Sequence, residues 1–305
     1  MKQINFGSTQ VKVPQVALGC MRMSGLSLKE AAEAVNTSLE EGINFFDHAD
    51  IYGGGESEIL FSQAVKELGV SRENMMIQSK CGIRDGFYDF SKEHIITSVE
   101  GILTRLGTDY LDVLALHRPD TLMEPEEIAE AFDYLQSKGM VRYFGVSNQG
   151  PMQMELIQKS LNQPLMVNQL QFGLKHAGMV AHGMNQNMEN ATGVYRDGGV
   201  LEYSRLKDIT IQAWSPYQYG YFDGVFLGHK DFKELNAVIN EMADKYGVTD
   251  TGIATAWINR HPANIQTIVG TMNPQRIKDI SAASEITLSR EDWYTLYKAS
   301  GYELL

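Results

Sequence analysis

The stretch Ile43-Asn44-Phe45-Phe46-Asp47-His48-Ala49-Asp50-Ile51-Tyr52-Gly53 decides the expected fold, because an apolar run passes directly into polar residues. Two later apolar runs, 75–77 and 111–116, lead in the same way to Lys80 and His117. Short apolar runs separated by helical patterns are typical of buried parallel strands. In a βα barrel the carboxyl ends of all strands open onto one face. We therefore expect the polar residues that follow these three strands to share one pocket.

Strands and helices are predicted to alternate along the whole chain. The first strand is 16–19, and a helix over 28–41 follows, which Ser27 caps and Gly42 ends. Further strands are predicted near 43–46, 74–79, 111–116, 141–146, 165–170, 209–213 and 266–269, and further helices near 56–68, 92–106, 125–138, 151–160, 231–246 and 274–284. Such alternation implies a parallel sheet with right-handed crossovers. Eight strands favour a closed (β/α)8 TIM barrel over a doubly wound sheet, whose glycine fingerprint is missing from 19–25.

Four segments fall outside this alternation. Residues 1–13 alternate around Gly7-Ser8 and predict a hairpin that plugs the bottom of the barrel. Residues 172–199 have no clear period and are rich in Gly, Asn and Met, so we expect a lid or a mobile loop. An extra helix is predicted over 249–260, and a short helix over 288–302 is expected to cover the outside. We expect a single domain over residues 1–305.

The composition is that of an ordinary globular protein. Of the 305 residues, 43% are hydrophobic and 21% are charged, and the net charge is −12. This acidity, without a basic run, argues against nucleic acid or an acidic membrane surface as a partner. No stretch approaches the roughly 18 apolar residues of a spanning helix, and no signal-peptide core begins the chain. With only Cys20 and Cys81 present, we expect structural thiols and a cytoplasmic location.

Seven short motifs, in order, resemble the signatures of the aldo-keto reductase family. They are Phe45 to Gly53, Ser79-Lys80, Leu116-His117, Gly145-Val146-Ser147-Asn148, Asn168-Gln169, Ala213-Trp214-Ser215-Pro216 and Val269-Gly270-Thr271. The resemblance spans nearly the whole chain. It implies an NAD(P)H-dependent oxidoreductase that reduces an aldehyde or ketone to an alcohol, or runs the reverse oxidation. We expect a monomer or weak homo-oligomer acting on a small-molecule carbonyl substrate.

The polar residues after the first strands suit proton transfer to a carbonyl oxygen. The pKa of a free phenol is about 10, too high for exchange near neutral pH, and a lysine within about 4 Å lowers it. Lys80 is the candidate for this role, and Asp47 would keep its ammonium charged. His117 would orient the substrate oxygen and steady its developing negative charge. The resemblance makes Tyr52 the general acid, assisted by Lys80, Asp47 and His117.

None of these residues transfers a hydride, so a cofactor has to supply the electrons. The resemblance implies a nicotinamide dinucleotide across the barrel mouth. In that arrangement Ser147, Asn148 and Gln169 bond the carboxamide and Trp214 stacks on the ring. Ser215 begins the expected pyrophosphate segment, and Gly270 and Thr271 follow the last strand, where many relatives carry a lysine and a serine. That lysine is missing here, but Arg276 is retained and its fork of donors suits a 2′-phosphate. NADPH is therefore favoured, with NADH use left open.

Two other classes of protein are weighed against the reductase. Some members of the superfamily bind the dinucleotide and serve mainly as regulatory or redox-sensing subunits with little turnover. A metal-dependent hydrolase of the same fold should show paired histidines after its first strand, and the chain has Met21-Arg22-Met23 there, so no metal is expected. The expected substrate walls are Met21 to Ser24, Phe87-Tyr88, Arg118, the 173–199 loop and Tyr217 to Phe222. Arg118 recruits a substrate carboxylate or pairs with Asp112 or Asp120.

Overall fold

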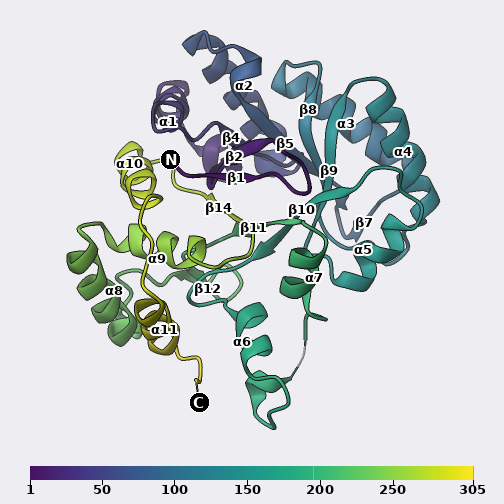
Figure 1. The fold of residues 1–305 in the computed structure, drawn as a ribbon. Helices are drawn as coiled ribbons and strands as arrows, with labels where there is room; N and C mark the ends of the chain where they lie inside the picture. Colours follow the sequence, from purple (N-terminus) through teal and green to yellow (C-terminus); the bar gives the residue numbers. More distant parts are fainter. Residues whose placement is uncertain (195, 305) are drawn as a thin grey trace.

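The predicted barrel is confirmed. The computed structural model describes residues 1–194 and 196–304; positions 195, inside the predicted long loop, and 305 lie outside the described residues. Eight parallel strands close into a barrel (Figure 1). In order around it they are β3 (Val16–Gly19), β4 (Phe45–Asp47), β5 (Met76–Cys81), β8 (Leu111–Leu116), β9 (Val141–Ser147), β10 (Leu165–Gln171), β11 (Thr210–Trp214) and β14 (Ile265–Val269). Every residue of β8 is buried, as expected for a strand covered on both faces.

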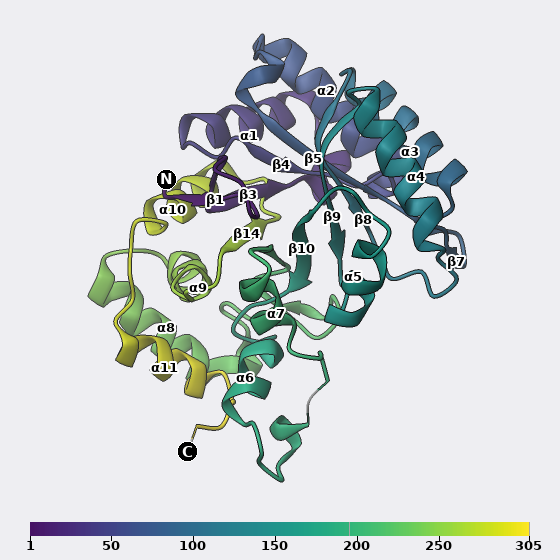
Figure 2. The ribbon, with the colours of Figure 1, turned by 45° about the vertical axis from the view of Figure 1, so that its right-hand side comes forward.

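Helices cover the outside of the barrel (Figures 1 and 2). They are α1 (Leu28–Glu40), α2 (Glu56–Leu68), α3 (Lys92–Leu106), α4 (Pro125–Ser137), α5 (Pro151–Gln158), α6 (Gly178–Met184), α7 (Val200–Leu206), α8 (Lys233–Tyr246), α9 (Asp250–Asn259), α10 (Pro274–Ala283) and α11 (Arg290–Ala299). Local sequence signals fix their ends. Ser27 and Glu30 form a capping box at the start of α1, and Gly107 ends α3 in the left-handed conformation. Among the described residues, no helix has both the length and the apolar character needed to cross a membrane.

The predicted N-terminal hairpin closes one end of the barrel. Strands β1 (Gln3–Asn5) and β2 (Lys12–Pro14) pair antiparallel. The fully buried Phe6 lies at the turn, with its ring centroid 6.2 Å from that of Phe45 and 5.5 Å from that of Tyr143. The backbone N–H of Gly7 donates to Thr210 Oγ1 at 2.8 Å, at the first residue of β11. The hairpin therefore covers the amino ends of the strands, opposite the face on which the predicted polar residues lie.

The helix that is additional to the regular alternation of strands and helices is α8, whereas the sequence predicted a different segment for this role. The sequence predicted 249–260 as the addition, but α9 packs directly on β14 and beside α10. Eight of its ten residues, Gly252 to Asn259, are buried. Helix α8 is amphipathic and packs against α9 and α11 instead, on the outside (Figures 1 and 2). A helix that is buried on all sides has to lie in the inner layer. The continuous burial of α9 therefore explains why α9 packs on the barrel and α8 is the added helix outside it.

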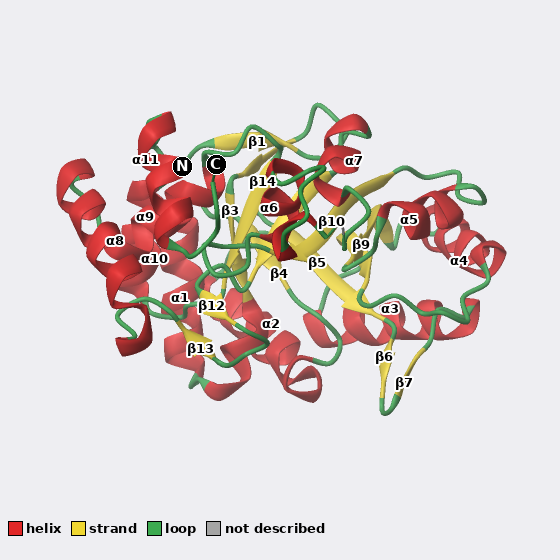
Figure 3. Ribbon diagram, turned by 90° about the horizontal axis from the view of Figure 1, so that it is seen from below, coloured by secondary structure: helices red, strands yellow, loops and turns green. Residues whose placement is uncertain are grey.

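The long loop predicted over 172–199 contains regular structure. It includes α6 and the short 3-10 helix η4 (Ala191–Gly193), and the sequence missed α7 directly after it. Both helices have only seven residues, too few to show a clear period. Two small hairpins, β6 (Ile83–Arg84) with β7 (Phe87–Tyr88) and β12 (Gln218–Tyr219) with β13 (Gly224–Val225), were also missed. They lie on the side of the barrel away from β1 (Figure 3).

Candidate active site

The structure brings Asp47, Tyr52, Lys80 and His117 together at the carboxyl ends of neighbouring strands. Asp47 is the last residue of β4, Lys80 lies in β5, and His117 directly follows β8. Tyr52 begins the short 3-10 helix η2 (Tyr52–Gly55). Glycines at 53, 54 and 55 all have positive φ, between 60° and 98°, and this tight turn leads the chain from the tyrosine into α2.

The Lys80 ammonium is the centre of this group. It is fully buried and lies 2.8 and 2.9 Å from the two carboxylate oxygens of Asp47. It also donates to the His48 carbonyl oxygen at 2.7 Å and to the Tyr52 phenol oxygen at 3.1 Å. A buried charge has to be paired and hydrogen-bonded, and this set of acceptors satisfies that requirement. One fixed cation therefore contacts both Asp47 and Tyr52.

The ionisation of Tyr52 differs from the expectation that Lys80 would lower its pKa. Burial is the largest influence and raises the pKa of the phenol, and the nearby Lys80 opposes this without reversing it. For Lys80 itself burial lowers the pKa, but the attraction of Asp47 and Tyr52 outweighs it and the net pKa is raised. Near neutral pH the phenol therefore keeps its proton and the ammonium keeps its charge. The site presents a neutral acid beside a permanent cation.

His117 lies edge-on to the Tyr52 ring, with 6.1 Å between the ring centroids. Burial lowers the pKa of its imidazole well below the usual value, and the positive charges of Lys80 and Arg118 act in the same direction. The imidazole is therefore neutral near pH 7. A neutral imidazole carries one N–H donor and one acceptor nitrogen. Within the described part of the chain, its buried Nδ1 has no hydrogen-bond partner.

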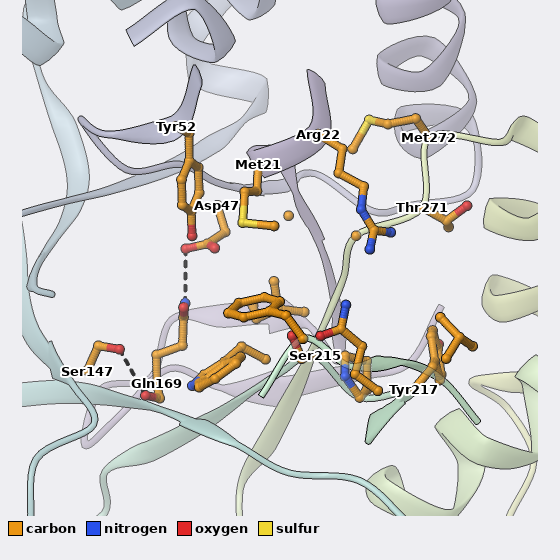
Figure 4. A pocket seen from close by; sticks show the side chains of 18 of the residues that line it. Met21, Arg22, Asp47, Tyr52, Ser147, Gln169, Ser215, Tyr217, Thr271 and Met272 are labelled. Atoms are coloured by element: carbon orange, nitrogen blue, oxygen red, sulfur yellow. Dashed lines mark hydrogen bonds between the residues drawn. The ribbon is translucent and has the colours of Figure 1, made fainter. Parts of the chain in front are cut away.

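Polar side chains at the carboxyl ends of β9, β10 and β11 form a connected group beside the four residues. Ser147 Oγ donates to the Gln169 carbonyl oxygen at 3.0 Å and accepts from Asn148 Nδ2 at 2.7 Å. Trp214 Nε1 donates to Asn148 Oδ1 at 3.1 Å. Gln169 Nε2 donates to Asp47 Oδ1 at 3.0 Å, which joins this group to the catalytic candidates (Figure 4). The amides are thus held in fixed orientations.

Ser215, Gly270, Thr271 and Arg276 lie farther along the same cavity. This cavity has a volume of about 960 Å³ and is lined by all of the predicted cofactor residues and by Asp47, Tyr52 and His117. Asn273 caps α10 by accepting from the Arg276 backbone N–H at 3.1 Å. Arg276 thereby lies in the first turn of α10, and it lines the cavity.

The chemistry of these donors suits a nicotinamide dinucleotide. The cavity wall offers a set of neutral amides with a flat indole, and a second set of hydroxyl groups with a guanidinium. An amide-bearing aromatic ring fits the first set, and a phosphate dianion fits the second. Ser147, Asn148, Gln169 and Trp214 would hold the nicotinamide, and Thr271 and Arg276 the adenosine phosphate. Among the described residues, no group of three or more His, Cys, Asp or Glu side chains is placed to hold a metal ion.

Comparison with known proteins decides the family. The aldo/keto reductase family model matches residues 15–300. The chain belongs to the aldo/keto reductase family. It is 32% identical over 304 residues to the 6-dehydroglucose reductase of Agrobacterium fabrum, with 95% of each protein covered. It is 34% identical over 288 residues to the uncharacterized oxidoreductase YcsN of Bacillus subtilis, with 90% of each covered. The thermostable aldo-keto reductase Tm1743, solved with the inhibitor epalrestat, has a TM-score of 0.79 at 25% identity, covering 98% of this chain and 100% of that one.

This aldo/keto reductase also contains a buried amide ladder that the motifs did not reveal. Asp47 Oδ1 accepts from Gln78 Nε2 at 2.7 Å, and Gln78 exchanges hydrogen bonds with Gln212 at 2.7 and 3.0 Å. Gln212 donates to Gln266, which donates to the Pro14 carbonyl oxygen of the hairpin. The ladder runs from the catalytic candidates to the closed end of the barrel. Its signal in the sequence is a glutamine two residues before Lys80 and another two before Trp214, inside apolar strands.

The expected substrate walls of the reductase need correction. The cavity is lined by Met21, Arg118 and Tyr217 as expected, and by Ile83, which was not expected. Phe87 and Tyr88 do not line it, and neither does any described residue of the 173–199 loop. Arg118 lies 5.5 Å from the Trp214 ring, a cation–π contact, and not beside an aspartate.

The two aspartates proposed as structural partners of Arg118 have other contacts. Asp112 pairs with Arg72 at 2.7 Å and with Arg142 at 3.0 Å. Asp120 accepts from the backbone N–H groups of Phe90 and Leu122. Both aspartates fix loops and strand ends, so the charge of Arg118 remains directed into the cavity.

Proposed function

We propose that the protein reduces an aldehyde or ketone to an alcohol with a nicotinamide dinucleotide, and that Tyr52 is the general acid. The observation that carries this proposal is the 3.1 Å hydrogen bond between Lys80 Nζ and the Tyr52 phenol oxygen on the wall of the cavity. A protonated phenol beside a fixed ammonium is a proton donor whose conjugate base is stabilised in place.

Each residue of the group has a separate task. When bound, the nicotinamide supplies the hydride to the carbonyl carbon. Tyr52 donates its proton to the carbonyl oxygen, and Lys80 stabilises the phenolate that remains. Asp47 holds Lys80 in place and balances its charge. The neutral His117 donates a hydrogen bond that orients the substrate oxygen. Run in reverse, the same phenolate accepts a proton from an alcohol.

The residues that line the cavity are proposed to bind the cofactor as follows. Ser147, Asn148 and Gln169 bind the carboxamide, and the Trp214 ring stacks on the nicotinamide. Ser215 binds the dinucleotide beyond the ring, Gly270 leaves room for it beside β14, and Thr271 contributes a hydroxyl group. Arg276 binds the adenosine 2′-phosphate, which favours NADPH while leaving NADH usable.

The oligomeric state, substrate class and location of the enzyme are also proposed. The chain works as one domain, a monomer or weak homo-oligomer, on a small-molecule carbonyl compound in the cytoplasm. Burial raises the pKa of both Cys20 and Cys81 well above the usual value, and unreactive buried thiols suit a structural role. The alternative of a regulatory subunit with little turnover has no specific contact in its favour. The complete proton-donating group favours the enzyme.

Titration with NADPH and NADH tests this proposal. Either dinucleotide should quench tryptophan fluorescence, because Trp214 lies in the cavity, and Trp214→Phe should remove most of the quenching while binding persists by calorimetry. Aliphatic, aromatic and sugar-derived aldehydes are then offered with the dinucleotide that binds more tightly. Turnover of any of them supports the enzyme. Binding without turnover across the set would support the regulatory subunit, and no binding of either dinucleotide would refute both.

A further inference from the structure

Arg118 lines the cavity without a hydrogen-bonding partner from the described part of the chain. It follows His117 at the end of β8 and is partly buried. Its guanidinium lies 5.5 Å from the centre of the Trp214 ring, and among the described residues it has no ion pair and no hydrogen bond. Asp112 and Asp120, the two aspartates nearest to it in the sequence, are held by other groups. The N–H donors of Arg118 are therefore free for a ligand.

The contact with Trp214 shows where this guanidinium lies. Trp214 is the last residue of β11, and β9 and β10 separate that strand from β8 around the barrel. The indole N–H donates to Asn148 Oδ1, directly after β9, at 3.1 Å, so the indole reaches from β11 toward β8. Arg118 meets it inside the cavity that both residues line. A contact with the face of the ring does not use the N–H donors of the guanidinium.

The charge of Arg118 acts on the group that is proposed to orient the substrate oxygen. Burial is the main cause of the lowered pKa of His117, and the charges of Lys80 and Arg118 add to it. Lys80 is already bound to Asp47 and Tyr52. Of these two cations Arg118 is the free one, so a ligand group bound to it lies close to the reacting carbonyl.

The cavity wall carries more cationic than anionic side chains, although the whole chain has a net charge of −12. The charged residues that line it are Arg22, Arg118, Arg276, Asp47 and Asp250. Arg276 is proposed above to bind the 2′-phosphate. Arg22 and Tyr52 lie on opposite sides of Met21, so Arg22 points away from the proposed acid (Figure 4). Arg118 is thus the arginine that a substrate anion would meet beside the catalytic group.

Apolar side chains form the neighbouring parts of the wall. Ile51 precedes Tyr52 in the sequence and lines the cavity. Ile83 also lines it and follows the end of β5, where Cys81 lies opposite Leu116 of β8. These side chains offer contacts to a hydrocarbon body but no acceptor or donor. The site therefore suits a carbonyl compound with a short apolar body and one anionic group.

We infer that the substrate is an aldehyde or ketone that carries a carboxylate, and that Arg118 binds this carboxylate. The inference rests on the proposed function, which supplies the reduction itself. The hydride adds to the carbonyl carbon, the Tyr52 proton adds to its oxygen, and the carboxylate keeps its charge, so the product is a hydroxy acid. A carboxylate can accept a pair of parallel N–H hydrogen bonds from one guanidinium. A monoanion therefore matches a single free arginine.

Two matched pairs of substrates test this inference. Succinic semialdehyde and 4-carboxybenzaldehyde carry the carboxylate on bodies of different length, and the methyl ester of each removes the charge. The value of kcat/KM is measured for acid and ester with the dinucleotide that binds more tightly, in the wild type, Arg118→Met and Arg118→Lys. The ratio of acid to ester is compared between proteins, so that general effects on catalysis or on dinucleotide binding cancel.

Arg84→Met is the matched control for the loss of one positive charge near the cavity. Arg84 belongs to β6 beside Ile83, pairs with Asp89 at 3.0 Å, has a side chain 44% exposed and does not line the cavity. A long-range effect of net charge would therefore appear in both methionine variants, whereas a direct contact with the substrate would appear only at Arg118.

The wild type should prefer the acid in at least one pair. Arg118→Met should lower that ratio by about tenfold or more, because a hydrogen-bonded charge pair is lost. Arg118→Lys should give an intermediate ratio, since its ammonium keeps the charge but not the planar fork of donors. Arg84→Met should leave the ratio within about twofold of the wild type.

Three results overturn the inference. In the first, the wild type reduces both esters at least as well as the acids. In the second, Arg118→Met keeps the preference for the acid, which means that another group binds the carboxylate. In the third, Arg84→Met lowers the ratio as much as Arg118→Met, which reduces the effect to net charge.

Failure of the proposed function gives a different result. In that case the wild type turns over neither the acids, nor the esters, nor any other aldehyde. Calorimetry with 4-hydroxybutanoate, the hydroxy acid formed from succinic semialdehyde, then tests the carboxylate site without turnover. Binding that Arg118→Met weakens by about tenfold or more and Arg84→Met spares would support the site, and absence of binding would overturn it.

Discussion

The chemistry of single residues in this protein is set by burial. His117 is 9% exposed and Lys80 is fully buried, yet the first is kept neutral and the second charged. Their surroundings explain the difference. Lys80 lies between two carboxylate oxygens, a carbonyl and a phenol, whereas His117 faces the two cations Lys80 and Arg118. The carboxyl end of the barrel therefore holds a cation and a neutral imidazole in the same site.

The reduction rate should be nearly independent of pH across the usual range of histidine. Burial raises the pKa of Tyr52 and lowers that of His117, so the first stays protonated and the second neutral between about pH 6 and 9. The measurement is kcat/KM across this range in Asp50→Asn, because burial raises the pKa of Asp50 to about 7 and its titration would overlap. An inflection near pH 6.5 in that variant would mean that His117 titrates normally.

The Glu58 carboxylate connects the elements around the turn that follows Tyr52. Glu58 of α2 is fully buried and accepts from Ser79 Oγ, next to Lys80 on β5, at 2.7 Å. Its other oxygen pairs with Arg105 of α3 at 2.7 Å. A side chain on Gly55, in the turn after Tyr52, would meet Arg105 Cδ at 2.7 Å. Two helices, a strand and the turn after Tyr52 thus meet at one partly buried ion pair.

Arg105→Ala should destabilise the protein by about 3 kcal/mol, because it leaves the Glu58 carboxylate buried without its partner. Urea unfolding of the wild type and the variant measures the change. Arg142→Ala is the control, since Arg142 is 54% exposed and Asp112 keeps its second partner Arg72. The control should lose at most about 1 kcal/mol. Equal losses in both variants would show that the Glu58 pair has no special role.

At the scale of the whole molecule, one end of the barrel is closed and the other is open. Phe6 packs against Phe45 and Tyr143 at the closed end, and the amide ladder from Gln266 to Asp47 connects this end with the active site. The hydrophobic residues under the hairpin form a cluster of their own, separate from the main core. Stability and catalysis are thus assigned to opposite ends, as in other TIM barrels.

Phe6→Ala should cost about 3–5 kcal/mol of stability, because it removes a fully buried ring from a packed cluster. Activity per folded molecule should stay the same, since Phe6 lies at the end opposite the cavity. Thermal unfolding and kcat measured on the same preparation check both parts. Leu122→Ala, at a leucine 83% exposed, is the control for an apolar truncation and should change stability by less than about 0.5 kcal/mol. A fall in kcat with unchanged stability would contradict the separation.

The sequence predicted the parts of this molecule that depend on local pattern. The strand over 111–116 and the helices over 56–68 and 92–106 are found with the predicted bounds. The sequence could not predict that α9 packs on the barrel and α8 lies outside it. Both segments have helical patterns, and only packing decides which of them lies inside. The prediction that Lys80 lowers the net pKa of Tyr52 was wrong, because the burial that raises this pKa arises only in the closed barrel.

The central claim is that Tyr52 gives the proton in a dinucleotide-dependent carbonyl reduction. It is tested most directly by single-turnover oxidation of bound NADPH by an aldehyde, in the wild type, in Tyr52→Phe and in Tyr88→Phe. Tyr88 is the control because it is 44% exposed and does not line the cavity. Tyr52→Phe should slow the step by at least about a hundredfold, because a general acid contributes this much, while NADPH binding is kept. Tyr88→Phe should react at the wild-type rate. A Tyr52→Phe protein that oxidises NADPH as fast as the wild type would contradict the account.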